Sequence, residues 1–295
     1  MKLGRSCIES TMDEADRNSG PYSQDPKATA HDPVRFATFL APNMFGVYRF
    51  VADYVGEKLG RRTDLVVGSS FDQFAAGQAE IGFLCGLPYV QLAHQSRPPV
   101  ELLAAPLLQG ERYGGRPVYF SDVIVHVDST YRSFSDLRGC SWTYNDPDSH
   151  SGYNVTRYQL VKMGETSSFF GRVVEAGSHQ RSIRMVCGGE VDAAAIDSQV
   201  LAVELRDYPD LRTQLRVIDV LGPAGIQPVV AASRLPDDLK AEVRSVLLAM
   251  DDDPLAKARL AHGFVERFVL VTDENYDDVR AMLSAAEDAG FMILR

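Results

Sequence analysis

One ten-residue pattern occurs twice in the chain and constrains its fold more than any other feature. Residues 77–86 read Gly-Gln-Ala-Glu-Ile-Gly-Phe-Leu-Cys-Gly, and residues 189–198 read Gly-Glu-Val-Asp-Ala-Ala-Ala-Ile-Asp-Ser. Each has a glycine that ends a helix, an acidic residue, an apolar strand, and a small or polar residue that opens the next helix. Strand–helix units share this pattern in general, but its repetition also indicates two lobes built on one plan. Ligands bind beyond the carboxyl ends of strands in open parallel sheets, so both segments then point to one cleft.

Predicted strands and helices alternate along most of the chain. Residues 34–40 read as a buried strand, and apolar residues at helical spacing from 47 to 59 predict a helix that Gly60 ends. The same alternation continues with strands at 65–68, 81–85, 123–127, 141–144, 172–175, 191–196 and 229–232, and helices at 71–75, 153–163 and 180–187. This pattern predicts an α/β fold in which each lobe is a mostly parallel sheet flanked by helices.

The end of the chain predicts that the first lobe is discontinuous. Two amphipathic helices, near 239–250 and 276–286, follow the last predicted strand and need a partner for their apolar faces. We therefore expect a first lobe of residues 34–121 and 225–295, a second lobe of residues 122–224, and a ligand cleft between them. Residues 1–33 are polar and rich in proline, and we expect them to form a disordered tail.

Composition and charge exclude several classes of protein. The formal net charge is −10, so the basic face that nucleic-acid binding requires is absent, whereas a few N–H groups can still bind a small anion. No apolar run reaches the ~18 residues of a membrane helix. The four cysteines form no CxxC pair, which favours unmodified thiols over a metal site or a disulfide framework. We expect a monomer with no cofactor, no metal, no nucleic-acid partner and no membrane insertion.

The beginning of the chain shows no export signal. Lys2, Arg5 and Cys7 are similar to the start of a lipoprotein signal, but residues 8–32 lack a continuous apolar core of about 7–15 residues. Either the protein stays inside the cell or a leader is missing from this sequence. As written, the sequence predicts a cytoplasmic protein.

A serine-rich turn is the best candidate for an anion site. Residues 148–153 read Asp-Ser-His-Ser-Gly-Tyr and stand between a predicted strand and a predicted helix. Ser149 and Ser151 offer hydroxyl groups, the first helical turn offers unpaired N–H groups, and the helix dipole favours an anion. Gly152 lets the backbone approach a ligand closely. The alternative is an ordinary helix cap, in which Asp148 or Ser149 satisfies the helix and no ligand binds.

Three segments resemble the phosphate/phosphite/phosphonate-binding proteins of ABC transporters, which have the type 2 periplasmic-binding fold. They are 135–139 (Ser-Asp-Leu-Arg-Gly), 145–153 (Asn-Asp-Pro-Asp-Ser-His-Ser-Gly-Tyr) and the repeat at 189–198, and the resemblance extends from about residue 34 to the C-terminus. It implies a two-lobed fold of this type with the solute in the cleft, and a serine turn that holds phosphonyl oxygens. The family usually has threonine where this chain has His150, which could add a proton-dependent donor or fit another solute.

The resemblance also implies further contact residues. His179 matches a position where the family often places a ligand-contacting histidine, and Asp197 matches an acid that faces the amine in aminophosphonate binders. Helix capping stays open as an alternative for both. Asn43 and Tyr89 are the best candidates in the first lobe, and Tyr153 could stack on the solute. The complete predicted ligand set is Asn43, Tyr89, Ser149, His150, Ser151, Gly152, Tyr153, His179 and Asp197.

These features favour a solute-binding protein that captures a small phosphonate- or phosphate-like anion, with an ABC permease as partner. The sequence contains no P-loop, HExxH, G-x-S-x-G or Rossmann glycine motif, and no catalytic residue is assigned. One alternative is a cytosolic enzyme on the same fold, similar to menaquinone-pathway dehydratases or lyases, with His150, His179 and Asp197 as acid–base groups. The other is a ligand-sensing regulatory module that a partner protein reads.

Overall fold

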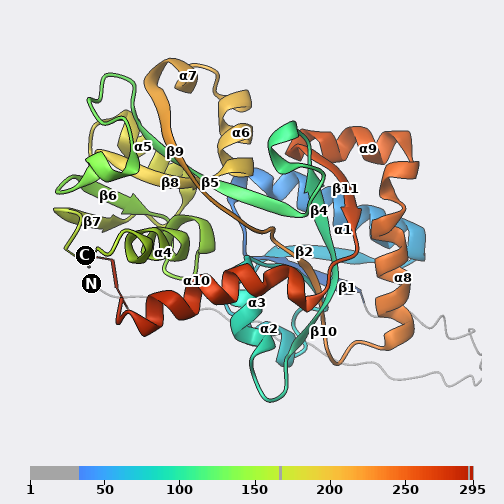
Figure 1. Ribbon diagram of the computed structural model, residues 1–295. Helices are drawn as coiled ribbons and strands as arrows, with labels where there is room; N and C mark the ends of the chain where they lie inside the picture. Colours follow the sequence, from blue (N-terminus) through green and yellow to red (C-terminus); the bar gives the residue numbers. More distant parts are fainter. Residues whose placement is uncertain (1–32, 166–167, 292, 295) are drawn as a thin grey trace, which may run out of the picture. The chain divides into compact units, whose positions relative to one another are not determined.

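The structure, a computed structural model, describes residues 33–165, 168–291 and 293–294 (Figure 1). The predicted tail therefore lies outside the described residues, except for Pro33. The described strands form two sheets. The first has the order β11-β4-β10-β3-β1-β2 and contains β1 (Val34–Thr38), β2 (Thr63–Val67), β3 (Ile81–Phe83), β4 (Val100–Leu108), β10 (Val229–Ala232) and β11 (Val265–Val269). The second has the order β7-β6-β8-β5-β9 and contains β5 (Val118–His126), β6 (Ser141–Tyr144), β7 (Arg172–Glu175), β8 (Ala193–Asp197) and β9 (Leu215–Gly225).

The elements around the first and second sheets are called the first and second lobe below. The second sheet begins with Val118 and ends with Gly225, so it includes a few residues that the sequence assigned to the first lobe. The lobe boundaries derived from the sequence stay a prediction.

Each sheet combines parallel and antiparallel strands. In the first, β1 is parallel to β2 and β3, while β10 is antiparallel to β3 and β4, and β11 is antiparallel to β4. In the second, β6 is parallel to β7 and β8, while β5 is antiparallel to β8 and β9. The strands that are linked by short strand–helix units pair in parallel, as expected: β1 with β2 and β3, and β6 with β7 and β8. The pairs that involve β4, β9 and β11 were missed because these strands were not recognised, whereas β3–β10 and β5–β8 join predicted strands whose relative direction the local pattern does not give.

Helices flank both sheets, and their packing places their N-termini near the strand ends. The first lobe contains η1 (Pro42–Met44), α1 (Phe45–Leu59), α2 (Asp72–Ala75), α3 (Gly86–Ala93), η2 (Glu111–Tyr113), α8 (Asp237–Leu248), η5 (Met250–Asp252), α9 (Pro254–Leu260), η6 (Ala261–Gly263), η7 (Asp273–Tyr276) and α10 (Asp277–Asp288). The second contains η3 (Phe134–Leu137), the π-helical turn η4 (His150–Asn154), α4 (Val155–Lys162), α5 (His179–Cys187), α6 (Ser198–Asp207) and α7 (Leu211–Gln214). None of the helices within the described ranges is long and apolar enough to cross a membrane.

The helix after the first strand shows how local sequence sets an element's bounds. Gly60 follows the last residue of α1 with a φ of 62°, in the left-handed region that glycine adopts without strain, so the helix ends there as predicted. The buried residues of α1, including Val51 and Val55, recur at helical spacing, and the helix packs against β2 and α8.

The two copies of the repeated pattern occupy equivalent places. Strand β3 lies between the parallel strand β1 and the antiparallel strand β10, and β8 lies between the parallel strand β6 and the antiparallel strand β5. A helix follows each of them, α3 after Cys85 and α6 after Asp197. The repetition in the sequence therefore corresponds to a repetition of strand arrangement in the two lobes.

The two lobes are in direct contact. The side-chain amide of Gln199 donates to the carbonyl oxygen of Gly263 at 2.7 Å, and the N–H of His150 donates to the Cys85 sulfur at 3.3 Å. Helix α10 adds a further link, because it packs against α3 of the first lobe and α4 of the second (Figure 1).

Candidate functional site

A cavity of about 440 Å³ lies between the lobes, within the range of pockets that hold small molecules. Loops that follow strands of both sheets form its walls. The first lobe contributes Phe39, Leu40, Ala41, Pro42, Tyr48, Val67, Gly68, Ser69, Ser70, Phe71, Cys85 and Pro88. The second contributes Asn145, Asp146, Asp148, Ser149, Ser151, Gly177, Ser178, His179, Asp197, Gln199 and Val200, and Gln227 lies on the segment that joins β9 to β10. Cys85 and Asp197, the ninth residues of the two repeated segments, thus line one cavity.

The serine turn forms part of the second-lobe wall. Ser149 caps η4, because its Oγ accepts a hydrogen bond from the N–H of Gly152 at 3.1 Å, and it lies 3.5 Å from the Oγ of Ser151. A hydroxyl oxygen that accepts a bond keeps its own proton available for donation. Ser149 can therefore cap the helix and donate to a ligand at the same time, so the two alternatives drawn from the sequence are compatible.

His179 supports the serine turn from the neighbouring helix. It is the first residue of α5, and its Nε2 lies 3.0 Å from the Oγ of Ser151. Burial lowers the pKa of His179 to about 3, so the ring is neutral at pH 7. If Nε2 carries the proton, His179 donates to Ser151 and leaves the Ser151 hydroxyl proton free for a ligand.

The N-terminus of α5 adds backbone donors to the same wall. Ser178 caps this helix and accepts from the N–H of Arg181 at 3.1 Å. The N–H groups of His179 and Gln180, in the first turn, have no acceptor within the helix. Both Ser178 and His179 line the cavity, so the positive end of the α5 dipole is close to it.

Asp197 contributes the buried negative charge of the cavity. Its Oδ1 accepts from the N–H groups of Gln199 at 2.8 Å and Val200 at 3.2 Å, and its Oδ2 accepts from the side chain of Gln227. Burial raises its pKa to about 6, against these hydrogen bonds, which favour the ionised form. The side chain therefore caps α6 and also presents a carboxylate to the cavity. No lysine or arginine is found among the described residues that line it.

Two residues of the predicted turn lie behind the wall. His150 does not line the cavity; its Nδ1 contacts the side-chain amide of Asn154 at 3.2 Å, and burial lowers its pKa to about 4. Gly152 is buried as well, and a Cβ at this position would clash with Oδ1 of Asn145. Gly152 thus lets the turn pack against Asn145, which itself lines the cavity.

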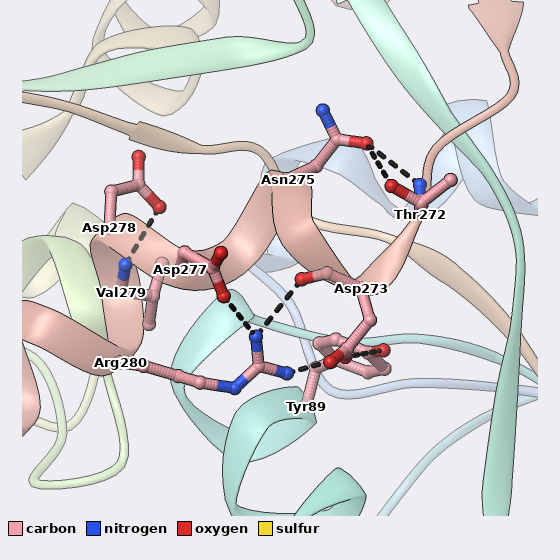
Figure 2. Close-up of polar contacts among 8 residues, drawn as sticks. All are labelled: Tyr89, Thr272, Asp273, Asn275, Asp277, Asp278, Val279 and Arg280. Carbon is pink, nitrogen blue, oxygen red and sulfur yellow. Dashed lines mark hydrogen bonds and ion pairs between the residues drawn. The ribbon is translucent and has the colours of Figure 1, made fainter.

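Three further predicted residues are also absent from the lining. The side-chain amide of Asn43 donates to the carbonyl oxygen of Val200 at 3.2 Å and to Glu204 Oε1 at 3.1 Å, which joins the two lobes. The Tyr89 hydroxyl donates to Asp273 Oδ1 at 2.6 Å; Figure 2 shows it beside Arg280, which pairs with the same carboxylate.

Tyr153 points to the C-terminal segment instead of the cavity. Its hydroxyl accepts from the N–H of Leu294 at 3.3 Å, and its ring packs on Tyr144 with centroids 4.7 Å apart. Of the nine predicted ligand residues, the structure therefore brings together Ser149, Ser151, His179 and Asp197.

Sequence reasoning missed most of the first-lobe wall. Phe39 and Phe71 line the cavity with their ring centroids 4.7 Å apart. Phe39 directly follows β1 in the structure, but the sequence placed it inside the strand predicted at 34–40 and so gave no sign that it lines a cavity. Gln227 was missed too, since it follows β9, a strand that was not predicted.

Comparison with known proteins decides the family. The family model described as "ABC transporter, phosphonate, periplasmic substrate-binding protein" matches residues 37–276. The chain belongs to this family. The phosphonates-binding periplasmic protein of Escherichia coli (strain K12) is 28% identical over 151 residues, which span 50% of this chain and 44% of that protein.

Solved structures of phosphonate-binding proteins share the fold. A binding protein component of an ABC phosphonate transporter from Pseudomonas aeruginosa matches with a TM-score of 0.77 at 18% identity, over 88% of each chain. A Prochlorococcus marinus protein in complex with methylphosphonate matches with a TM-score of 0.73 at 18% identity, over 84% of this chain and 96% of that one. The predicted two-lobed type 2 periplasmic-binding fold is confirmed.

The family corrects the predicted location. The sequence as written was expected to be cytoplasmic because no export signal was recognised in it. That expectation is wrong, since the phosphonate-binding family consists of periplasmic proteins, which act outside the cytoplasm.

Proposed function

We propose that this protein binds a phosphonate in the cavity between its lobes and delivers it to an ABC permease. The observation that carries the proposal is the hydrogen-bonded group of Ser149, Ser151 and His179 beside the N-terminus of α5. Hydroxyl and backbone N–H donors can surround the three oxygens of a phosphonyl group without a cationic side chain.

The buried carboxylate of Asp197 suggests that the solute also carries an amine. A carboxylate taken out of water is unfavourable unless an opposite charge or hydrogen bonds compensate it. An ammonium group in the cavity would restore the ionised form of Asp197 and would lower its raised pKa. We therefore extend the proposal to aminoalkylphosphonates, with the phosphonyl group on the serine turn and the amine on Asp197.

Binding without chemistry explains the site better than an enzyme does. Ser151 and His179 form a serine–histidine pair, but burial holds the pKa of His179 near 3, too low for an effective general base near neutral pH. Among the described residues, no side chain is hydrogen-bonded to Nδ1 of His179, so nothing orients the ring as the carboxylate of a catalytic triad does. The pair is instead suited to orienting the Ser151 hydroxyl as a hydrogen-bond donor to the ligand.

A thermal-shift series with methylphosphonate, 2-aminoethylphosphonate, phosphite, phosphate and benzoate tests the proposed function. A ligand at 100 times its Kd stabilises the folded state by about 2.7 kcal/mol, which corresponds to a rise of roughly 5 °C or more for a chain of this size. We expect such a rise with at least one phosphonate, with the phosphonate recovered unchanged. A response to benzoate alone, or turnover of the phosphonate, would contradict the proposal.

A further inference from the structure

The first-lobe wall of the cavity contains an aromatic surface that a small anion would not use. Phe39 and Phe71 are both partly exposed and line the cavity, and their rings lie 4.7 Å apart at an angle of 38°. Phe74 lies behind them, fully buried, with its ring 5.9 Å from that of Phe39. The two outer rings therefore form a firm apolar face, called the Phe39–Phe71 face below.

Glycines in the adjacent strand region hold this face in place. A Cβ on Gly68 would clash with the ring of Phe39, and a Cβ on Gly82 would clash with the ring of Phe74. The N–H of Gly68 also bonds the carbonyl oxygen of Thr38 at 2.9 Å, which fixes the backbone beside the face. The rings are thus packed against the chain at sites where only glycine fits, and a side chain in either place would displace them.

The volume of the cavity exceeds what a compact anion needs. A phosphonyl group with one methyl substituent replaces only about three or four waters of about 30 Å³ each, or roughly 100 Å³. The cavity measures about 440 Å³. The cavity has this volume although the Gln199–Gly263 and His150–Cys85 hydrogen bonds join the two lobes.

We propose that the natural solute is an organophosphonate that carries, in addition to the amine proposed for Asp197, an apolar substituent of about ring size, which packs on the Phe39–Phe71 face. This inference rests on the proposed function, since it assumes that the phosphonyl group occupies the serine turn. With the anion on the second-lobe wall, the substituent extends toward the aromatic rings of the first lobe. Burial of its apolar surface and its contact with the rings then select it over methylphosphonate or phosphite.

Calorimetry with phenylphosphonate and methylphosphonate tests this inference on the wild-type chain. Both probes carry the same anionic group, so the ratio of their Kd values isolates the substituent. We expect phenylphosphonate to bind about tenfold more tightly or better. Equal affinities, or tighter binding of methylphosphonate, would overturn the inference and leave the proposed function standing. Binding of neither probe would overturn both.

Variants test whether the preference for phenylphosphonate over methylphosphonate comes from the Phe39–Phe71 face. Phe39→Ala and Phe71→Ala should reduce the ratio toward one while methylphosphonate affinity changes less than about threefold. Phe50→Ala, which truncates a partly exposed phenylalanine outside the cavity, is the matched control and should keep the wild-type ratio. Phe39→Leu and Phe71→Leu, which keep apolar volume, serve if an alanine variant fails to fold. A wild-type ratio in the Phe71 and Phe39 variants would overturn the assignment of the face.

Discussion

The two walls of the cavity are built from equivalent parts of the fold but differ in chemistry. The second-lobe wall presents the hydroxyls of Ser149 and Ser151, the first turn of α5 and the carboxylate of Asp197. The first-lobe wall presents the Phe39–Phe71 face. The second-lobe wall can therefore fix the orientation of a charged group, while the aromatic rings of the first-lobe wall provide apolar contact beside the hydroxyl groups of Ser69 and Ser70.

Equivalent residues of the two repeated segments show the same chemical difference between the walls. Cys85 and Asp197 both precede a helix that starts beside the cavity. Asp197 accepts two backbone N–H groups of α6, whereas Cys85 makes no side-chain cap to α3. Burial raises the pKa of the Cys85 thiol, so it stays protonated and neutral. The repetition therefore specifies the backbone, and the side chain that directly precedes the next helix specifies the chemistry.

The largest expected effect comes from removing the donors of the second-lobe wall. The double variant Ser149→Ala/Ser151→Ala should bind methylphosphonate at least tenfold more weakly in calorimetry, because each charge-assisted hydrogen bond contributes about 1.5–3 kcal/mol. Loss of the Ser149 cap should also cost about 1 kcal/mol of stability. Ser133→Ala removes a capping serine of the same lobe outside the cavity, and should leave the affinity unchanged. An unchanged affinity in the double variant would show that the second-lobe wall does not bind the anion through these serines.

An intermediate effect is expected from the charge of Asp197. Its pKa is about 6, so below this pH the carboxyl group must release a proton before it can pair with an amine. The ratio of the affinity for 2-aminoethylphosphonate to that for ethylphosphonate should therefore rise as pH increases from 5 to 7.5. Phosphate-type groups also ionise near pH 6, and the ammonium group shifts this ionisation in only one of the two ligands, so the profile is compared with that of a variant without the carboxylate. Asp197→Asn, which keeps a capping oxygen, should flatten the profile.

The smallest effect concerns the histidines. A protonated His150 or His179 in contact with the ligand would strengthen anion binding as pH falls from 8 to 6. Burial lowers their pKa values to about 4 and about 3, so neither ring titrates in this range. Methylphosphonate titrations of wild type and His179→Gln should then show parallel pH profiles. A rise in affinity at low pH that occurs in wild type and disappears in the variant would show that His179 does become charged when the ligand binds.

Local patterns predicted several elements together with their bounds. The strands predicted at 141–144, 172–175 and 229–232 coincide with β6, β7 and β10, and α1 ends at Gly60 as expected. Strands β4 and β9 were missed because each contains a proline, Pro106 or Pro223, which argues against a strand in a local reading. Strand β11 lies about 160 residues from β4, and β5 lies about a hundred residues from β9, and no local pattern reveals such pairing.

The same distinction applies to the candidate site. Ser149, Ser151, His179 and Asp197 line the cavity because helix starts after strands place them there, and a helix start can be read from a few neighbouring residues. Asn43, Tyr89 and Tyr153 were also placed by position in a loop or turn. Their side chains instead bond to Glu204, Asp273 and Leu294, which are remote in sequence.

A crystal structure of the protein with bound methylphosphonate tests the central claim most directly. The account predicts one phosphonyl group in the cavity, with its oxygens within about 2.5–3.2 Å of the Oγ atoms of Ser149 and Ser151 and of an N–H group at the start of α5. The methyl group should point away from this wall, toward the Phe39–Phe71 face. A phosphonyl group bound elsewhere, or one held in the cavity with neither serine hydroxyl in contact, would contradict the account.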